Sequence, residues 1–456
     1  KIAHEKFVDA RIGTLLEAAG RELESAGRTS ADDDDVALVR NTQRNWDKAR
    51  RVPPELAAEI ARAASLGQEI WAEARQANSF KAFEPALKEN IELKQRYVEC
   101  FDDFDAAYDV VLDDYEPEIT SAEVTHHFAA LRDALVPLIA EVTKHEIDDS
   151  YLHHPVPVEV QRKLVYEVIG LQGFEADSWR ADDSTHPFAT SFGPSDVRIT
   201  DRWEENYFPS SLFGAMHETG HGLYEAGIAP ALYRTPVGNV ASLGLHESQS
   251  RLWENMVGRG RPFADTLAPR IARTIGGPLS GLTPDALFRA VNKVQPSLIR
   301  VEADEATYGL HIVIRFELEQ ALIEGTLAVA DLPEAWNAKY KDYLGIDVPD
   351  DAHGVLQDVH WSAGLIGYFP TYALGNLIAG QLWAKARAEL PDLDGQLAAG
   401  EFSGLREWLR ENVHQHGSKY PTPALLDRVV GTGIEVDPFV DYLRAKLSDV
   451  YELSFT

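Results

Sequence analysis

The run His217-Glu218-Thr219-Gly220-His221 constrains the fold of this chain most strongly, because its spacing has a chemical meaning only on a helix. Residues four apart on a helix lie on one face, about one turn from each other. Both imidazoles could then reach one metal ion. Pro209 and Ser210 are typical of a helix start, and Gly227 is typical of a helix end. The sequence therefore predicts a helix over 209–227 that carries both histidines.

Three glycines lie inside this predicted helix, at positions 214, 220 and 222. Each glycine destabilises a helix interior by about 1 kcal/mol relative to alanine. The cost is most easily explained if another backbone approaches the helix closely. We therefore expect a second element to pack tightly against it.

The chemistry of the run is that of a zinc peptidase. His217 and His221 would bind the ion, and Glu218 would lie beside a water molecule that it can deprotonate. Tetrahedral zinc then needs a third protein ligand and keeps one position open for water. The candidates for this ligand are Glu225, His246 and Glu247. Glu225 continues the same helical face but lies two turns, about 11 Å of rise, from His217.

Glu247 is the preferred third ligand. It lies on the next predicted helix, over 241–254, where Gly244 fits the close approach inferred above. The alternative is a glutamate on the helix surface. His246 points away from the ion if Glu247 points toward it, so we interpret His246 as a supporting or packing residue.

Composition limits the other classes of function. The chain has 456 residues, 45% of them apolar, which is enough for a large core. A net charge of −30 argues against nucleic acid and anionic membranes as partners, and no apolar run approaches the roughly 18 residues of a membrane span. The single cysteine fits a reducing compartment, so we expect a cytoplasmic protein. The sequence starts at Lys1, and we expect that residues are missing before it.

Helical periodicity dominates the chain. We predict helices over 3–27, 35–49, 54–78, 80–112, 121–144, 157–171, 264–275, 283–295, 304–325, 332–343, 373–390, 402–413, 422–430 and 437–450. The exception is 184–206, which predicts a β-hairpin bordering the active-site cleft. The predicted fold is all-α with this small β-element: one domain over 1–456, with two lobes around a groove.

Several motifs together resemble one family, the carboxypeptidase Taq metallocarboxypeptidases. They run in the family's order: His186–Phe188, Asp196–Thr200, His217–His221, His246–Asn255, Ile299–Asp304, Gly354–Trp361 and Gly367–Tyr372. The resemblance implies a mostly helical fold with a deep groove, and one divalent ion (zinc, with cobalt as a substitute). It also implies release of C-terminal residues from peptide substrates, and a homodimer. The chain departs from the family only in beginning after its usual N-terminal segment.

Two further roles, stabilising the tetrahedral intermediate and recognising the substrate carboxylate, must be assigned to residues. A hydrogen-bond donor must stabilise the tetrahedral intermediate, and His360, Tyr368 and Tyr372 are the candidates, Tyr372 first. The alternative for each tyrosine is a core residue with a satisfied hydroxyl. A carboxypeptidase must also recognise a free carboxylate, as arginine does with a two-pronged contact.

Arg300 and Arg198 are the candidates for that contact, and the resemblance favours Arg300. Arg300 could instead form an ion pair with Glu302 or Asp304. Arg198 could pair with Asp196 and brace the hairpin, which we consider its main role.

A carboxylate or carbonyl usually accepts a hydrogen bond from the second nitrogen of a metal-bound histidine. Thermolysin-like peptidases have an acid four residues after the glutamate ligand, where this chain has Arg251. The supporting acid must therefore come from elsewhere, and Glu225 and Glu254 are both possible.

Three functions remain open at this point. A metallocarboxypeptidase would not cleave a peptide with an amidated C-terminus. A metallo-oligopeptidase that cuts inside short peptides would tolerate amidation and the loss of Arg300. A zinc-stabilised scaffold without catalysis would be unaffected by Glu218→Gln, but the presence of a base in the motif argues against it.

Overall fold

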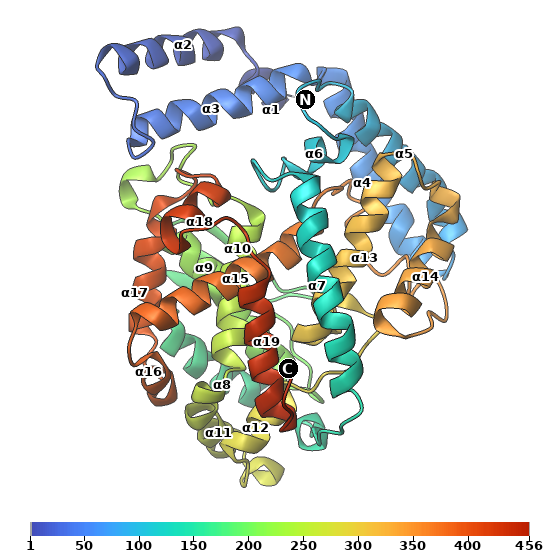
Figure 1. Cartoon of the computed structure of the whole chain (residues 1–456), viewed down its shortest axis with the longest axis vertical. Helices are drawn as coiled ribbons and strands as arrows, with labels where there is room; N and C mark the ends of the chain where they lie inside the picture. The colour runs from blue at the N-terminus through green and yellow to red at the C-terminus, as the bar shows by residue number, and fades with distance from the viewer. Residues whose placement is uncertain (1, 456) are drawn as a thin grey trace.

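The structure is a computed structural model that describes residues 2–455, and it is mostly helical (Figure 1). Its first helices are α1 (Ile2–Phe7), α2 (Ala10–Ser25), α3 (Asp34–Arg51), α4 (Pro54–Gln76), α5 (Phe80–Val98), α6 (Ala107–Leu112), α7 (Ser121–Val142) and α8 (Val158–Gln172). After the strands come α9 (Pro209–Gly227), α10 (Leu243–Arg251), the π-helical segment η3 (Leu252–Gly258), α11 (Arg261–Ile275), α12 (Pro284–Val291), the short turn η5 (Arg300–Glu302), α13 (Glu305–Ile323) and α14 (Leu332–Leu344). The chain ends with α15 (Pro370–Glu389), α16 (Leu393–Ala399), α17 (Ser403–Asn412), α18 (Thr422–Val430) and α19 (Asp437–Tyr451).

The predicted all-α class is confirmed, and most predicted helices are present with shifted ends. Two segments that were each predicted as one continuous helix are divided into two helices in the structure. The helix predicted over 3–27 is broken between α1 and α2, where the Asp9 side chain accepts a hydrogen bond from Arg11 N and so caps α2. The helix predicted over 80–112 is broken between α5 and α6, and α16 was not predicted at all.

A small sheet precedes α9. Its strands are β1 (Trp179–Asp183), β2 (Ala189–Gly193) and β3 (Asp196–Asp201), in the order β1-β3-β2. The predicted hairpin over 184–206 is confirmed by the antiparallel pair β2–β3. The parallel partner β1 was not predicted. Both β2 and β3 contact α9, so the sheet lies beside the helix that carries the histidine motif.

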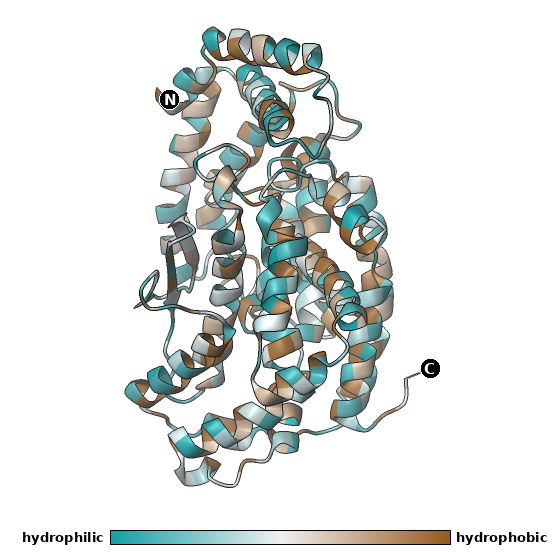
Figure 2. Cartoon of the chain, turned by 90° about the vertical axis from the view of Figure 1, so that its left-hand side faces the viewer, coloured by the Kyte–Doolittle hydropathy of each residue, from teal (hydrophilic) through white to brown (hydrophobic). Residues whose placement is uncertain are grey.

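The helices form two groups that meet at α15 (Figure 1). On one side lie α4, α5, α7, α13 and α14; on the other lie α8 to α12 and α16 to α19. Helix α15 packs against α10, α13 and α19, and α7 packs against α13 and α19. Most helices present apolar residues on one face and polar residues on the other (Figure 2).

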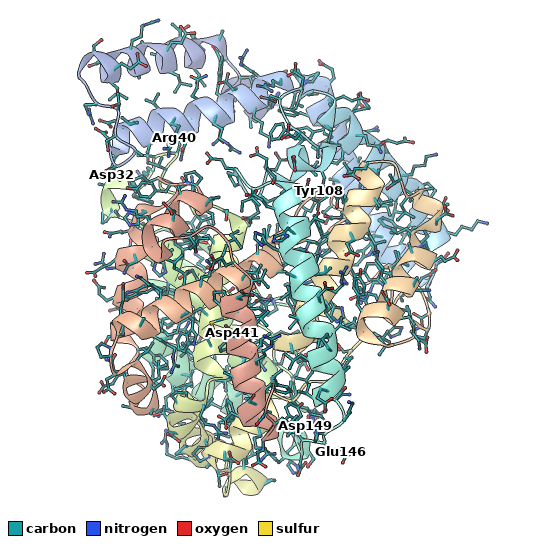
Figure 3. The ribbon with its side chains drawn as sticks, in the orientation of Figure 1. Asp32, Arg40, Tyr108, Glu146, Asp149 and Asp441 are labelled. Atoms are coloured by element: carbon teal, nitrogen blue, oxygen red, sulfur yellow. The ribbon has the colours of Figure 1, made fainter. Side chains whose placement is uncertain are left out.

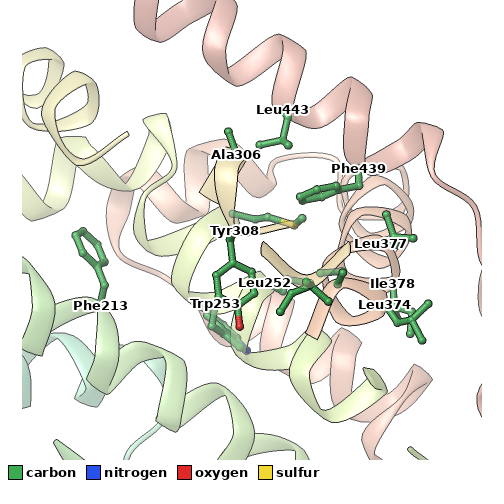
Figure 4. Close-up of a cluster of buried hydrophobic side chains, with 14 of the residues drawn as sticks. Phe213, Leu252, Trp253, Ala306, Tyr308, Leu374, Leu377, Ile378, Phe439 and Leu443 are labelled. Carbon is green, nitrogen blue, oxygen red and sulfur yellow. The ribbon is translucent and has the colours of Figure 1, made fainter. Parts of the chain in front are cut away.

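The main hydrophobic core extends through both groups of helices. Where η3, α13, α15 and α19 meet, Leu252, Tyr308, Leu377 and Phe439 lie close together (Figure 4). Because η3 continues directly from α10, this packing also holds α10 against α15.

The N-terminal helices α2 and α3 project at one end of the molecule, where they are tied to the chain before α18. Asp32, which is labelled in Figure 3, accepts a hydrogen bond from the Tyr420 hydroxyl at 2.6 Å. Lys419 pairs with Asp34 at 2.6 Å. Across residues 2–455, no helix combines the length and apolarity that a membrane crossing requires.

Candidate metal centre

Helix α9 has the predicted bounds and places His217 and His221 one turn apart, with ring centroids 4.8 Å from each other. Glu247 reaches them from α10. Its Oε2 lies 3.7 Å from Nε2 of His217 and 3.3 Å from Nε2 of His221. The structure thus brings together the three side chains proposed as ligands, with one donor atom from each within 4.8 Å of the others.

Close backbone packing makes this approach possible. A Cβ on Gly220 would lie 2.8 Å from both the Gln249 carbonyl oxygen and the Ser250 Cα, so α9 and α10 are in backbone contact at this glycine. A Cβ on Gly375 of α15 would lie 2.7 Å from Cγ of Glu247. The prediction that Gly244 faces α9 was wrong, because Gly244 lies against the Glu116 carboxylate.

The orientation of His217 is set by Glu254. Nδ1 of His217 lies 2.9 Å from Oε2 of Glu254, so the imidazole donates there and turns Nε2 toward Glu247. Burial raises the pKa of Glu254, but the His217 hydrogen bond and the charges of Arg251 and Arg259 lower it to about 2. Glu254 is therefore a charged acceptor on this histidine.

Glu225, the other acid considered for this role, contacts a different histidine. Its Oε1 lies 3.0 Å from Nε2 of His246, and the His246 ring stacks on His221 with centroids 4.2 Å apart. Burial lowers the pKa of His221 to about 3, so this imidazole is neutral at neutral pH.

These observations fit a cation. Nε2 of His217, whose ring is oriented by Glu254, faces a carboxylate oxygen of Glu247 at 3.7 Å, and Nε2 of His221 lies beside it. Two histidines and one carboxylate are a common ligand set of catalytic zinc sites.

Glu218 follows His217 on α9 and is buried, with 6% of its surface exposed. Burial raises the pKa of Glu218 to about 7, opposed by His217 and reinforced by the nearby carboxylates Glu247 and Glu254.

Arg300 is also buried, with 4% exposed. The alternative of an ion pair with Glu302 or Asp304 is not what the structure has: Glu302 is exposed, and Asp304 caps α13 through hydrogen bonds from backbone N–H groups. Arg300 pairs with Asp358 at 2.8 Å instead, and its Nη1 donates to the Tyr308 hydroxyl at 3.0 Å.

Tyr368, Tyr372 and His360 form one aromatic cluster at the start of α15. Nε2 of His360 lies 3.0 Å from the Tyr372 hydroxyl, and the two tyrosine rings are 5.4 Å apart. The guanidinium of Arg300 lies 4.9 Å from the Tyr372 ring. Burial raises the pKa of Tyr372 well above its usual range, so its hydroxyl remains a proton donor.

Arg198 lies apart from these residues, on β3. It is half-exposed and pairs with Asp196 at 2.9 Å, as predicted. Its guanidinium also lies over the Phe192 ring, a contact that was not predicted.

Sequence reasoning missed three neighbours of the candidate ligands and of Arg300: Arg251, Tyr308 and Asp358. Arg251 donates from Nε to Oε1 of Glu247 at 2.6 Å, and its guanidinium lies 4.1 Å from the Tyr308 ring centroid. The signal for Arg251 was its position four residues after Glu247, which places both on one helical face.

Comparisons with known proteins show similarity over nearly the whole chain. The sequence profile of the family described as carboxypeptidase Taq (M32) metallopeptidase matches residues 1–447. The chain is 41% identical to thermostable carboxypeptidase 1 of Thermus thermophilus over 99% of this chain and 90% of the relative. It is 38% identical to carboxypeptidase 1 of Bacillus subtilis over 92% of this chain and 84% of the relative. The crystal structure of an M32 carboxypeptidase from Deinococcus radiodurans R1 superposes with a TM-score of 0.94 at 38% identity, covering 99% of this chain and 90% of that chain.

Proposed function

The chain belongs to the carboxypeptidase Taq (M32) family of metallopeptidases and is a metal-dependent carboxypeptidase; on this premise we propose that His217, His221 and Glu247 hold its divalent ion. The observation that carries the proposal is the convergence of their three donor atoms within 4.8 Å, with His217 oriented by Glu254.

We assign the proton transfers to Glu218. An ion bound at this site would supply Lewis acidity to the scissile carbonyl and to a water molecule. Glu218 accepts the proton from the attacking water and delivers it to the nitrogen of the departing amino acid. Its burial beside His217 suits this role, because proton transfer is most efficient in a site from which bulk water is excluded.

Arg300 is our candidate for the C-terminal carboxylate of the substrate. An arginine has five N–H donors, and the contacts of Arg300 with Asp358 and Tyr308 engage one on each of its three nitrogens. One N–H on each terminal nitrogen is left, which is enough for a two-pronged contact with a carboxylate. Tyr372, with Tyr368 and His360 beside it, is our candidate donor to the oxyanion.

Four finer assignments complete the proposal. We propose zinc as the ion, with cobalt able to replace it, because the ligand set suits zinc. A homodimer is expected from the family resemblance alone. The cytoplasm is the proposed location because the single cysteine, Cys100, is free. With a net charge of −30, peptides rather than nucleic acids or anionic membranes are the expected partners.

One experiment tests the assignment of the site. The zinc-loaded protein, Glu218→Gln and His217→Ala are each incubated with one peptide in free-ended and amidated forms, and the products are identified by mass. The parent protein should release single residues from the free-ended peptide only, and neither variant should do so. Release by His217→Ala at the rate of the parent would contradict the proposed metal site.

A further inference from the structure

The two oxygens of the Glu247 carboxylate have different surroundings. Oε2 faces both imidazole nitrogens, at 3.7 Å and 3.3 Å. Oε1 accepts a hydrogen bond from Nε of Arg251 at 2.6 Å. The guanidinium therefore covers the oxygen that does not face the histidines.

Arg251 is itself held in place from two further sides. Its guanidinium lies over the Tyr308 ring, 4.1 Å from the centroid, and its Nη1 lies 3.5 Å from Oε2 of Glu254. Only 14% of the Arg251 side chain is exposed. An arginine cannot lose its charge in a protein, so this contact to Glu247 persists at all working pH values.

The stem of Glu247 is fixed as well. Its Cβ and Cγ pack against Gly375 of α15, which leaves room for them because it has no side chain. The carboxylate oxygen Oε2 accepts a hydrogen bond from Ser250 Oγ at 3.1 Å. With the stem held and Oε1 engaged, rotation of the carboxylate toward an ion would break a charge-assisted hydrogen bond, a contact worth about 1.5–3 kcal/mol.

We propose that Arg251 is a positioning residue that restricts Glu247 to a single oxygen ligand, Oε2; this inference rests on the proposed metal centre. A carboxylate with two free oxygens can bind an ion through both. Here the second oxygen would occupy the coordination position that a catalytic site keeps open for water and substrate. Arg251 thereby preserves an open position without contacting the ion or the substrate.

Cobalt provides a readout that is independent of activity, because its visible absorption depends on coordination number and geometry. We would load the parent protein, Arg251→Gln, Arg251→Lys and Arg259→Gln with Co²⁺ and record their spectra. Arg259 is the matched control, since it contacts Glu254 at 3.1 Å and forms no hydrogen bond or ion pair with Glu247 within residues 2–455.

The parent should show intense four-coordinate bands, and Arg251→Gln should show weaker bands typical of a higher coordination number. We expect Arg251→Gln to lower kcat about 10-fold to 100-fold. Arg251→Lys, which keeps a positive charge for Oε1, should regain the parent spectrum, and Arg259→Gln should keep it. A parent-like spectrum in folded, cobalt-bound Arg251→Gln would overturn the inference.

A second measurement does not depend on the folding of a variant. In a crystal structure of the zinc-loaded parent, only Oε2 of Glu247 should lie at the usual zinc–oxygen distance of about 2.0–2.2 Å, with Arg251 on Oε1. Both oxygens at that distance would also overturn the inference. Cobalt bands that persist unchanged in His217→Ala would instead contradict the proposed metal centre itself, so the two failures are distinguishable.

Discussion

Gly220→Ala tests whether backbone contact between α9 and α10 sets the geometry of the ligands. The added Cβ would lie 2.8 Å from the Gln249 carbonyl oxygen and from the Ser250 Cα, whereas ordinary contact begins at 3.4 Å. Both neighbours are backbone atoms, so no side-chain rotation can relieve the contact. The two helices must therefore separate by about 0.6 Å, and Glu247 moves with α10.

That displacement is large compared with what a metal site accepts. Ligand distances at metal sites hold to within about 0.2 Å, and the expected separation of Glu247 from both imidazoles is three times as large. We therefore expect zinc to bind about 10-fold more weakly or worse, where each factor of ten corresponds to roughly 1.4 kcal/mol. The effect on folding should be smaller. Overpacking costs about 1–3 kcal/mol, and replacing a helical glycine by alanine returns about 1 kcal/mol.

The assay compares zinc dissociation constants, measured by competition with a chelator, and urea unfolding midpoints. Gly170→Ala is the matched control: Gly170 lies within α8, and a Cβ there would meet no atom within 4 Å. The control should unfold at a slightly higher urea concentration and bind zinc as the parent does. If Gly220→Ala binds zinc with the affinity of the parent, the contact between the two helices does not set the ligand geometry.

Three further predictions concern other parts of the site and the fold. Glu218→Gln should lower kcat/KM by about 10²–10⁴ without loss of bound zinc, and loss of zinc by dialysis would show that Glu218 is a ligand. Arg300→Lys keeps the buried charge beside Asp358 but loses the planar fork, so KM for free-ended peptides should rise about 10-fold to 100-fold; an unchanged KM would assign the carboxylate to another residue. Burial raises the pKa of Glu116 to about 8, so its contribution to folding stability is fully present below pH 4.5 and is lost as the pH rises through 8. Between pH 5 and pH 8 the urea midpoint of the parent should therefore fall more than that of Glu116→Gln, and equal slopes would contradict the raised pKa.

The helices were largely predictable because their signals are local. Helix α9 has the predicted bounds, since proline, glycine and apolar periodicity all lie within the segment itself. The break between α5 and α6 lacks such a signal, with no proline or glycine in 99–106. A tertiary contact holds it instead: Arg51 pairs with Asp103, 52 residues further along the chain. The Asp109 side chain then caps α6 locally by accepting a hydrogen bond from Ala106 N.

Strand β1 was missed for a related reason. Its sequence Trp179–Asp183 has only two apolar residues in a short, mostly charged segment, and its pairing with β3 is parallel and non-local. The hairpin β2–β3, by contrast, is closed by a short turn after Gly193, which a sequence pattern can reveal.

The same distinction applies to the site. Glu218 and the two histidines share one helix, and helical spacing alone brings them together. The partner of Arg300 comes from 58 residues away, and local reasoning offered only its neighbours Glu302 and Asp304. Spacing along a helix cannot rank acids that lie on other elements.

Burial of charge offers a signal that spacing does not. Arg315 interrupts the apolar run Ile312-Val313-Ile314 before Phe316, and Asp358 follows Val355 and Leu356 in another apolar stretch. A charge carried into the core on such a segment needs an opposite charge there, because leaving it unpaired costs about 3–5 kcal/mol. Arg315 and Asp358 are 2.6 Å apart, and Arg300 shares the same carboxylate. Two residues of opposite charge, each within a largely apolar stretch of sequence, therefore indicate a buried ion pair. Here one carboxylate lies between two arginines, so one positive charge is left in excess, and it suits the carboxylate of an incoming substrate.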